Sequence, residues 1–258
     1  MLIVSLRPGR FNEMLGLATM RLLSILACVM FATGCSKHNS AGDATAEFWT
    51  WFAANSSEYA RLLSYEENAA SPDDPKRQKR VEQVVSDTAT HLRRIHPQFS
   101  PFFGYSEDTN KLMITVFGEK QFFGEVDRFV STAPKIAGWS FVALKPPLTF
   151  SADTEIKSGS VTLKLGDMRY SRQAQADGSF AFTIFVPSNV SSDPDGFRQL
   201  CTRLLEDSLG ERVAATAIHS VEVRQLDANS PTGLLEFIQV HRDITTNGAS
   251  SGTGISKP

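Results

Sequence analysis

Cysteine and histidine are the residues of this 258-residue chain whose types suit nucleophilic chemistry. A catalytic thiol or hydroxyl requires a base, usually a histidine, and a third group that orients this base. The histidines are His38, His91, His96, His219 and His241, and His91 and His96 are expected to be exposed near a helix end. Cys201 shares an apolar helical stripe with Phe197 and Leu204, which is typical of a buried core cysteine. The sequence therefore predicts no catalytic residue.

Acidic pairs occur at Asp73-Asp74 and at Asp193 and Asp195, and carboxylates are the ligands that Ca²⁺ prefers. Each pair stands at the start of a predicted helix, where carboxylates cap backbone amides and complement the helix dipole. The sequence contains no His-Glu-x-x-His or Cys-x-x-Cys pattern and no Gly-x-x-x-x-Gly-Lys loop for phosphate. We therefore predict helix capping at these positions, no metal site and no cofactor.

Cys35 ends a segment with the features of an export leader. Arg21 precedes an uncharged run over residues 22–34, and small residues stand before the cysteine. The run is shorter than the roughly 20 helical residues that cross a bilayer. The sequence predicts a cleaved signal peptide over residues 1–34, which starts at Met1 or at the internal Met14 or Met20.

The residues Ala32-Thr33-Gly34-Cys35 resemble the lipobox of bacterial lipoprotein leaders, in which the cysteine receives a diacylglyceryl group. Ala32 stands where that family usually has leucine. The resemblance implies lipidation of Cys35, and Ser36 in place of an aspartate implies the outer rather than the inner membrane, with the domain in the periplasm. Residues 35–44 are predicted to be the lipidated cysteine and a flexible tether. A plain secretory leader and a buried helix are the alternatives.

Composition narrows the class of the remaining chain. A net charge of -2 gives no positive field for a nucleic acid, and 41% hydrophobic residues are ample for a folded core. Three cysteines exclude a disulfide-dense scaffold and a four-cysteine zinc site. We predict a compact domain that does not bind nucleic acid.

The pattern of apolar residues predicts a single α+β domain over residues 45–242, in which helices pack mainly on one face of an antiparallel sheet. Helices are expected to start at Thr45 and Pro75 and to cover residues 122–130, 194–209 and 231–241. Strands are expected at residues 102–105, 112–117, 139–144, 161–165, 180–186 and 218–223. Residues 243–258 are predicted to be a disordered tail.

Two surface features are candidate partner-binding sites. Trp49 and Trp51 cannot both face one helical stripe, so Trp49 is a candidate exposed anchor. Four basic residues near the start of the second helix form a candidate anionic docking patch: Lys76, Arg77, Lys79 and Arg80. The alternative interpretations are core packing for the aromatic residues and an ordinary charged helix face for the cations.

Three short motifs extend this picture: Phe48-Trp49-Thr50-Trp51-Phe52, Ala133-Pro134-Lys135-Ile136-Ala137-Gly138-Trp139 and Leu209-Gly210-Glu211. On these motifs the stretch from Phe48 to Leu209 resembles an uncharacterised bacterial family of small α+β domains. The resemblance implies packing roles for the motifs and implies no reaction. The export leader is a departure from that family.

We therefore predict a lipid-anchored envelope lipoprotein whose non-catalytic domain binds an unknown ligand or protein partner in the periplasm. One alternative is an immunity protein that neutralises an exported toxin. Another is an envelope hydrolase that uses a carboxylate site not recognisable from sequence. Convergent carboxylates in a deep cleft would favour the enzyme, and a closed apolar pocket would favour a ligand-binding role.

Overall fold

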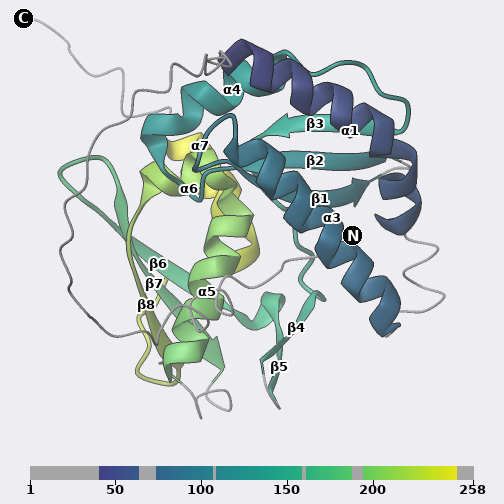
Figure 1. The fold of residues 1–258 in the computed structure, drawn as a ribbon. Helices are drawn as coiled ribbons and strands as arrows, with labels where there is room; N and C mark the ends of the chain where they lie inside the picture. The colour runs from purple at the N-terminus through teal and green to yellow at the C-terminus, as the bar shows by residue number, and fades with distance from the viewer. Residues whose placement is uncertain (1–40, 64–73, 107–108, 159–160, 188–193, 249–258) are drawn as a thin grey trace, which may run out of the picture. The chain divides into compact units, whose positions relative to one another are not determined.

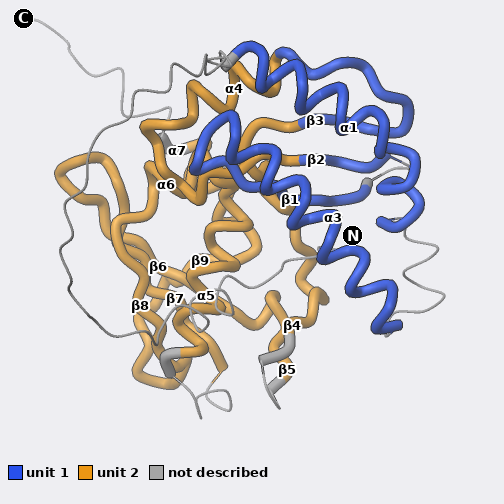
Figure 2. Tube along the Cα trace, in the orientation of Figure 1, with its two compact units in different colours: residues 1–112, 132–141 blue, residues 113–131, 142–258 orange. Residues whose placement is uncertain are grey.

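The computed structural model of the chain describes residues 41–63, 74–106, 109–158, 161–187 and 194–248. Helices and strands mix along these residues in an α+β arrangement, as predicted (Figure 1). The chain divides into two compact units (Figure 2): unit 1 comprises residues 1–112 and 132–141, and unit 2 comprises residues 113–131 and 142–258. The predicted signal peptide, Cys35 and the tether up to residue 40 lie outside the described residues.

The first helices of unit 1 are α1 (Ala41–Leu63) and α3 (Pro75–Arg93). Because α1 begins at Ala41, the predicted tether is wrong from that residue onward; alanine is a strong helix former and Asp43 favours the first turn. The Asp74 side chain accepts a hydrogen bond from the backbone N–H of Lys76 at 3.0 Å, which confirms the predicted cap. Asp73 and Asp193 lie outside the described residues.

A three-stranded sheet has the order β1-β2-β3, and the boundary between the units passes through its second and third strands. The strands are β1 (Ser100–Ser106), β2 (Thr109–Thr115) and β3 (Trp139–Ala143), close to their predicted positions. Between β2 and β3 the chain forms a short 3-10 helix, η2 (Lys120–Phe122), and α4 (Phe123–Ser131), which both belong to unit 2.

Aromatic side chains form the core of unit 1. The Phe52 and Trp139 rings meet edge to face with centroids 4.9 Å apart, and both side chains are buried. The Trp139 indole N–H donates to the backbone oxygen of Ser56 at 3.1 Å, so the buried ring keeps a hydrogen bond. The motifs at residues 48–52 and 133–139 thus pack against each other within unit 1.

The main sheet of unit 2 has the strand order β8-β7-β6-β9. Its strands are β6 (Arg169–Ala174), β7 (Phe180–Pro187), β8 (Ile218–Leu226) and β9 (Leu235–Glu236), and β4 (Glu155–Ser158) pairs separately with β5 (Val161–Lys164). Strands β6 and β7 are antiparallel, but β7 and β8 are parallel, so the prediction of a purely antiparallel sheet is wrong. The chain joins β7 to β8 through α5 (Pro194–Leu209) and α6 (Glu211–Ala217), and such a helical crossover brings the second strand back in the same direction.

The core of unit 2 lies between this sheet and its helices. Alternate residues of β7 are buried together with the apolar stripe of α5, and these include Phe182, Ile184, Phe197, Cys201 and Leu205. This sheet face and the apolar side of α5 therefore share one core.

The C-terminal helix differs from its prediction. Residues 231–234 are not helical; after β9 and the 3-10 helix η5 (Phe237–Gln239), α7 runs from Val240 to Gly248. Val240 and Ile244 lie on one face of α7 and both are buried, so the tail predicted from residue 243 is helical up to Gly248. The Tyr170 hydroxyl adds a 2.8 Å hydrogen bond to Asp243 of this helix.

Gly210 lies between α5 and α6, where the backbone of residues 146–147 comes close to it. Its φ is 74°, and a Cβ built there would lie 2.6 Å from the backbone nitrogen of Pro147 and 2.8 Å from its Cδ. The stop that the sequence predicts for α5 is confirmed, since α5 ends at Leu209. The residue also has to be glycine for the 146–147 segment to pack here.

We predict that Gly210→Ala lowers the free energy of unfolding by about 3 kcal/mol, because the strain of a left-handed alanine adds to overpacking against Pro147. Gly178→Ala is the matched control: Gly178 has a φ of 83°, but nothing lies within 4 Å of its built Cβ. The control should lose only about 1 kcal/mol. Urea denaturation of both variants measures the difference, and equal losses would contradict a steric role for Pro147.

Candidate functional site

The buried carboxylate of Glu211 joins three segments of unit 2. Its Oε1 accepts hydrogen bonds from the backbone N–H groups of Val116 and Gly118, both at 3.0 Å. Its Oε2 accepts from the backbone N–H of Lys145 at 3.1 Å, and the N–H of Glu211 donates to the oxygen of Lys145 at 2.8 Å. The side chain is thus committed to holding the backbone of residues 116–118 and 145.

Two non-glycine residues beside these amides adopt left-handed backbone conformations. Phe117 has a φ of 52° and Leu144 a φ of 63°. Each such conformation costs on the order of 1–3 kcal/mol, whereas a hydrogen bond to a charged acceptor contributes about 1.5–3 kcal/mol. Three bonds to the carboxylate therefore outweigh the strain. Phe117 is 63% exposed, so packing of its own side chain does not explain its conformation.

A pocket of about 200 Å³ lies next to Glu211, within unit 2. It is formed by the segment after β3, by the junction of α5 and α6, and by the start of α7. Its lining residues are Ala143, Leu144, Lys145, Pro146, Pro147, Leu209, Gly210, Arg212, Val213 and His241. Among these described lining residues, three are basic and none is acidic.

The three basic side chains have different surroundings. Arg212 is held by Asp127 at 2.7 Å and lies over the Phe123 ring, with 5.2 Å between the guanidinium carbon and the ring centroid. Burial lowers the pKa of Lys145, and Arg203 lowers it further, although nearby carboxylates oppose the shift: Asp207, Glu211 and Glu206. The Nδ1 atom of His241 is buried and has no hydrogen-bond partner among the residues that the structure describes.

Three of the carboxylates near the pocket are committed to other groups. Glu211 binds backbone amides, Asp127 binds Arg212, and Asp207 pairs with Arg203 of α5 at 3.2 Å. The pocket wall therefore presents cationic groups and apolar surface. Such a wall suits a small ligand that carries a negative charge.

Trp49, the predicted anchor, is only 6% exposed. Its indole N–H donates to the Thr132 hydroxyl at 3.0 Å and its ring meets Phe141 edge to face at 4.8 Å, so the prediction of an exposed anchor is wrong. The Trp51 indole of the same motif is half-buried and stacks on the His91 ring, with 3.8 Å between the ring centroids. His91 and His96 are likewise half-buried rather than exposed.

Two of the four residues of the predicted basic cluster contact α1. Arg77 donates to the backbone oxygen of Leu62 at 2.7 Å, and Arg80 pairs with Glu58 at 2.6 Å. Both partners belong to α1, so the packing of α3 against α1 engages two of the four cations. Lys76 and Lys79 are exposed.

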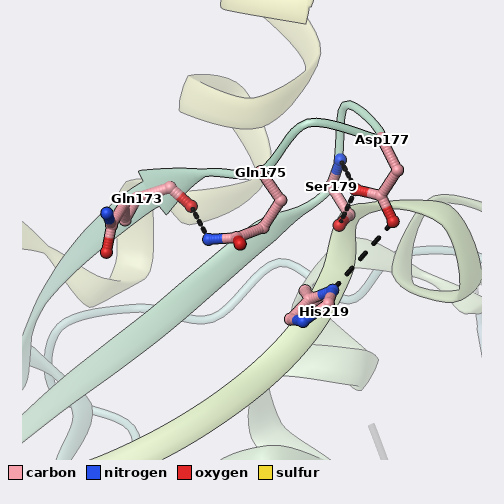
Figure 3. A network of polar contacts seen from close by, with 5 residues as sticks. All are labelled: Gln173, Gln175, Asp177, Ser179 and His219. Carbon is pink, nitrogen blue, oxygen red and sulfur yellow. Dashed lines mark hydrogen bonds and ion pairs between the residues drawn. The ribbon is translucent and has the colours of Figure 1, made fainter.

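A serine, an aspartate and a histidine lie close together at the turn between β6 and β7 and the start of β8 (Figure 3). The Ser179 hydroxyl donates to Oδ1 of Asp177 at 2.5 Å, and Nδ1 of His219 lies 4.0 Å from Oδ2. A hydrolytic triad places the histidine between serine and acid, but here the aspartate is in the middle. Hydrogen bonds from Ser179 also lower the pKa of Asp177. The group therefore stabilises the turn.

Gln173 lies near the end of β6 and Gln175 directly follows this strand. The Gln175 side-chain amide donates to the backbone oxygen of Gln173 at 3.1 Å. Over the residues that the structure describes, no group of three or more His, Cys, Asp or Glu residues could hold a metal ion. No helix in the described ranges is long and apolar enough to span a bilayer.

The residues of the pocket were not predicted as a site from the sequence. Lys145, Arg212 and His241 come from three distant segments, and none of them belongs to a motif with a known spacing. The only local signal is the Leu209-Gly210-Glu211 motif, whose glycine and glutamate shape the pocket wall without supplying its cations.

Comparison with known proteins finds no family model, no curated protein and no solved structure that matches this chain. The functional argument therefore rests on the residues of the chain itself.

We predict that Glu211→Gln lowers the free energy of unfolding by about 3 kcal/mol, because the amide NH₂ that replaces one carboxylate oxygen faces backbone donors. Urea denaturation measures the loss. Glu206→Gln, at an exposed position of α5, is the control and should change stability by less than about 0.5 kcal/mol. A loss at Glu211 no larger than at Glu206 would refute the structural role of the carboxylate.

Cys201 is fully buried, and burial raises the pKa of its thiol to about 12, which confirms the predicted core cysteine. We predict that a Cys28→Ser/Cys35→Ser protein does not react with Ellman's reagent when native and releases one equivalent of thiolate in urea. Because the folded pKa is raised, the stability contribution is complete below the unfolded pKa of about 8.5 and is lost as pH rises toward 12. Rapid labelling of the native protein would show that the thiol is accessible.

Proposed function

We propose that this protein is a lipid-anchored cell-envelope protein whose domain binds a ligand without catalysing a reaction. The proposal of a lipid anchor is supported by the sequence: Arg21 precedes an uncharged run over residues 22–34, and Ala32-Thr33-Gly34 stand directly before Cys35. A diacylated cysteine would hold the chain at a bilayer durably, since each buried methylene contributes about 0.8 kcal/mol and more than one chain is attached.

The start of α1 limits how far the domain could extend from such an anchor. Helix α1 begins at Ala41, six residues after Cys35 in the sequence. Even a fully extended chain of that length spans no more than about 20 Å. The proposed anchor would therefore keep α1 near the lipid headgroups. With Ser36 after the cysteine, we propose the outer membrane of a two-membrane bacterium, with the domain in the periplasm.

The described side chains support binding rather than catalysis. The Cys201 thiol is buried and protonated at neutral pH, and the Ser179 hydroxyl donates to a carboxylate instead of to a base. The basic pocket of unit 2, by contrast, offers charged groups and apolar surface in one concavity. These observations favour a ligand-binding role over the hydrolase alternative.

We predict that Cys35→Ala abolishes incorporation of radiolabelled palmitate and moves the protein from the membrane to the soluble fraction of a two-membrane bacterial host. Cys28→Ala is the matched control, because it removes a leader cysteine but keeps Ala32-Thr33-Gly34-Cys35 intact, and it should label like the parent. Ser36→Asp should shift the labelled protein toward the inner membrane in a density gradient. Equal labelling of Cys35→Ala and the parent would exclude the anchor.

A further inference from the structure

We propose that the pocket of unit 2 lined by Lys145, Arg212 and His241 binds the carboxylate of a small ligand that has an apolar body. The inference rests on the binding role proposed above, but it is independent of the lipid anchor. The ligand class follows from the charge, the unpartnered nitrogen and the size of the pocket.

Charge selects an anion. Every ionisable side chain among the described lining residues is basic, and the carboxylate closest in sequence, Glu211, is turned toward backbone amides. Asp127 lies outside the pocket wall and fixes Arg212 through a 2.7 Å contact, which restrains the guanidinium. A restrained guanidinium loses less conformational freedom when it binds a carboxylate.

His241 supplies a second reason. Buried polar atoms in folded proteins nearly always have a hydrogen-bond partner. The buried Nδ1 of His241 has none within the described part of the chain. His241 already lines the pocket, and even a neutral imidazole carries one N–H donor that could serve a ligand there. A carboxylate oxygen there would be the acceptor that the described chain does not provide.

The remaining lining residues indicate that the rest of the ligand is apolar. They are apolar and include Leu144, Pro146, Pro147 and Val213. The volume of about 200 Å³ is below the range of roughly 300–1,000 Å³ that is usual for drug-sized ligands. A short-chain acid fits these limits, and so does an aspartate or glutamate side chain of a peptide. The shared chemistry is a carboxylate on a few carbon atoms.

The test uses the full chain with Cys35→Ala, which retains all described residues and lacks the proposed anchor. Isobutyrate is titrated while NMR records the backbone amide of Gly210 and the ring nitrogens of His241. We expect saturable shifts with a Kd on the order of 1 mM, as is reasonable for a ligand of so few atoms. Isobutyramide has the same shape without the charge and should bind at least tenfold more weakly.

Variants assign the binding to the proposed residues. His241→Phe should weaken isobutyrate binding at least tenfold, whereas the matched control His219→Phe, at an exposed position of β8, should bind like the parent. Lys145→Met removes the ammonium but keeps the backbone N–H that Glu211 binds, so it should weaken binding without loss of fold. Unchanged amide spectra outside the pocket verify that each variant is folded.

Two further probes identify the source of the carboxylate. Stronger binding of acetyl-Ala-Glu-Ala-amide than of isobutyrate would support a peptide side chain as the ligand, and the reverse would support a free acid. Inorganic phosphate that binds more tightly than both would overturn the proposal, and so would equal binding of isobutyramide or no saturable shift with either acid. These failures would leave the palmitate labelling of Cys35 unaffected, so the two proposals can fail separately.

Discussion

The architecture around the candidate site depends on one interaction, the acceptance of three backbone hydrogen bonds by the buried carboxylate of Glu211. A charge taken out of water is costly unless hydrogen bonds surround it, and here backbone donors from two separate segments do so. In return the carboxylate fixes left-handed turns at Phe117 and Leu144. The end of β2, the segment after β3 and the start of α6 are thereby held in register.

This interaction also explains how the pocket acquires its charge. Glu211 is bonded to the backbone of Lys145 and precedes Arg212, so an acidic residue orients two basic neighbours while its own oxygens point at amides. Gly210 completes the arrangement, because its missing Cβ lets the 146–147 segment approach the junction of α5 and α6. The negative charge of Glu211 is bound by backbone amides, whereas the basic side chains of Lys145 and Arg212 line the pocket.

Features set by nearby residues could be predicted from the sequence. The start of α3 at Asp74 and Pro75, the end of α5 before Gly210 and the burial of Cys201 all follow from caps or helical periodicity. The parallel pairing of β7 with β8 and the burial of Trp49 depend on contacts between distant segments, and they were predicted wrongly. The hydrogen bond from Val116 to Glu211 joins residues 95 positions apart in the sequence. A local sequence pattern does not predict a hydrogen bond between such distant residues.

The exposure of Phe117 shows whether side-chain packing or backbone hydrogen bonding causes the left-handed conformation at this turn. If side-chain packing imposed the left-handed conformation, the phenyl ring would be buried, but it is 63% exposed. The N–H groups of Val116 and Gly118, on either side of Phe117, both donate to the Glu211 carboxylate. These backbone hydrogen bonds therefore stabilise the left-handed turn, and packing of the Phe117 ring does not. Strain held in this way by a buried charge is a property of a rigid framework. A rigid wall suits a small ligand, because little conformational freedom is then lost on binding.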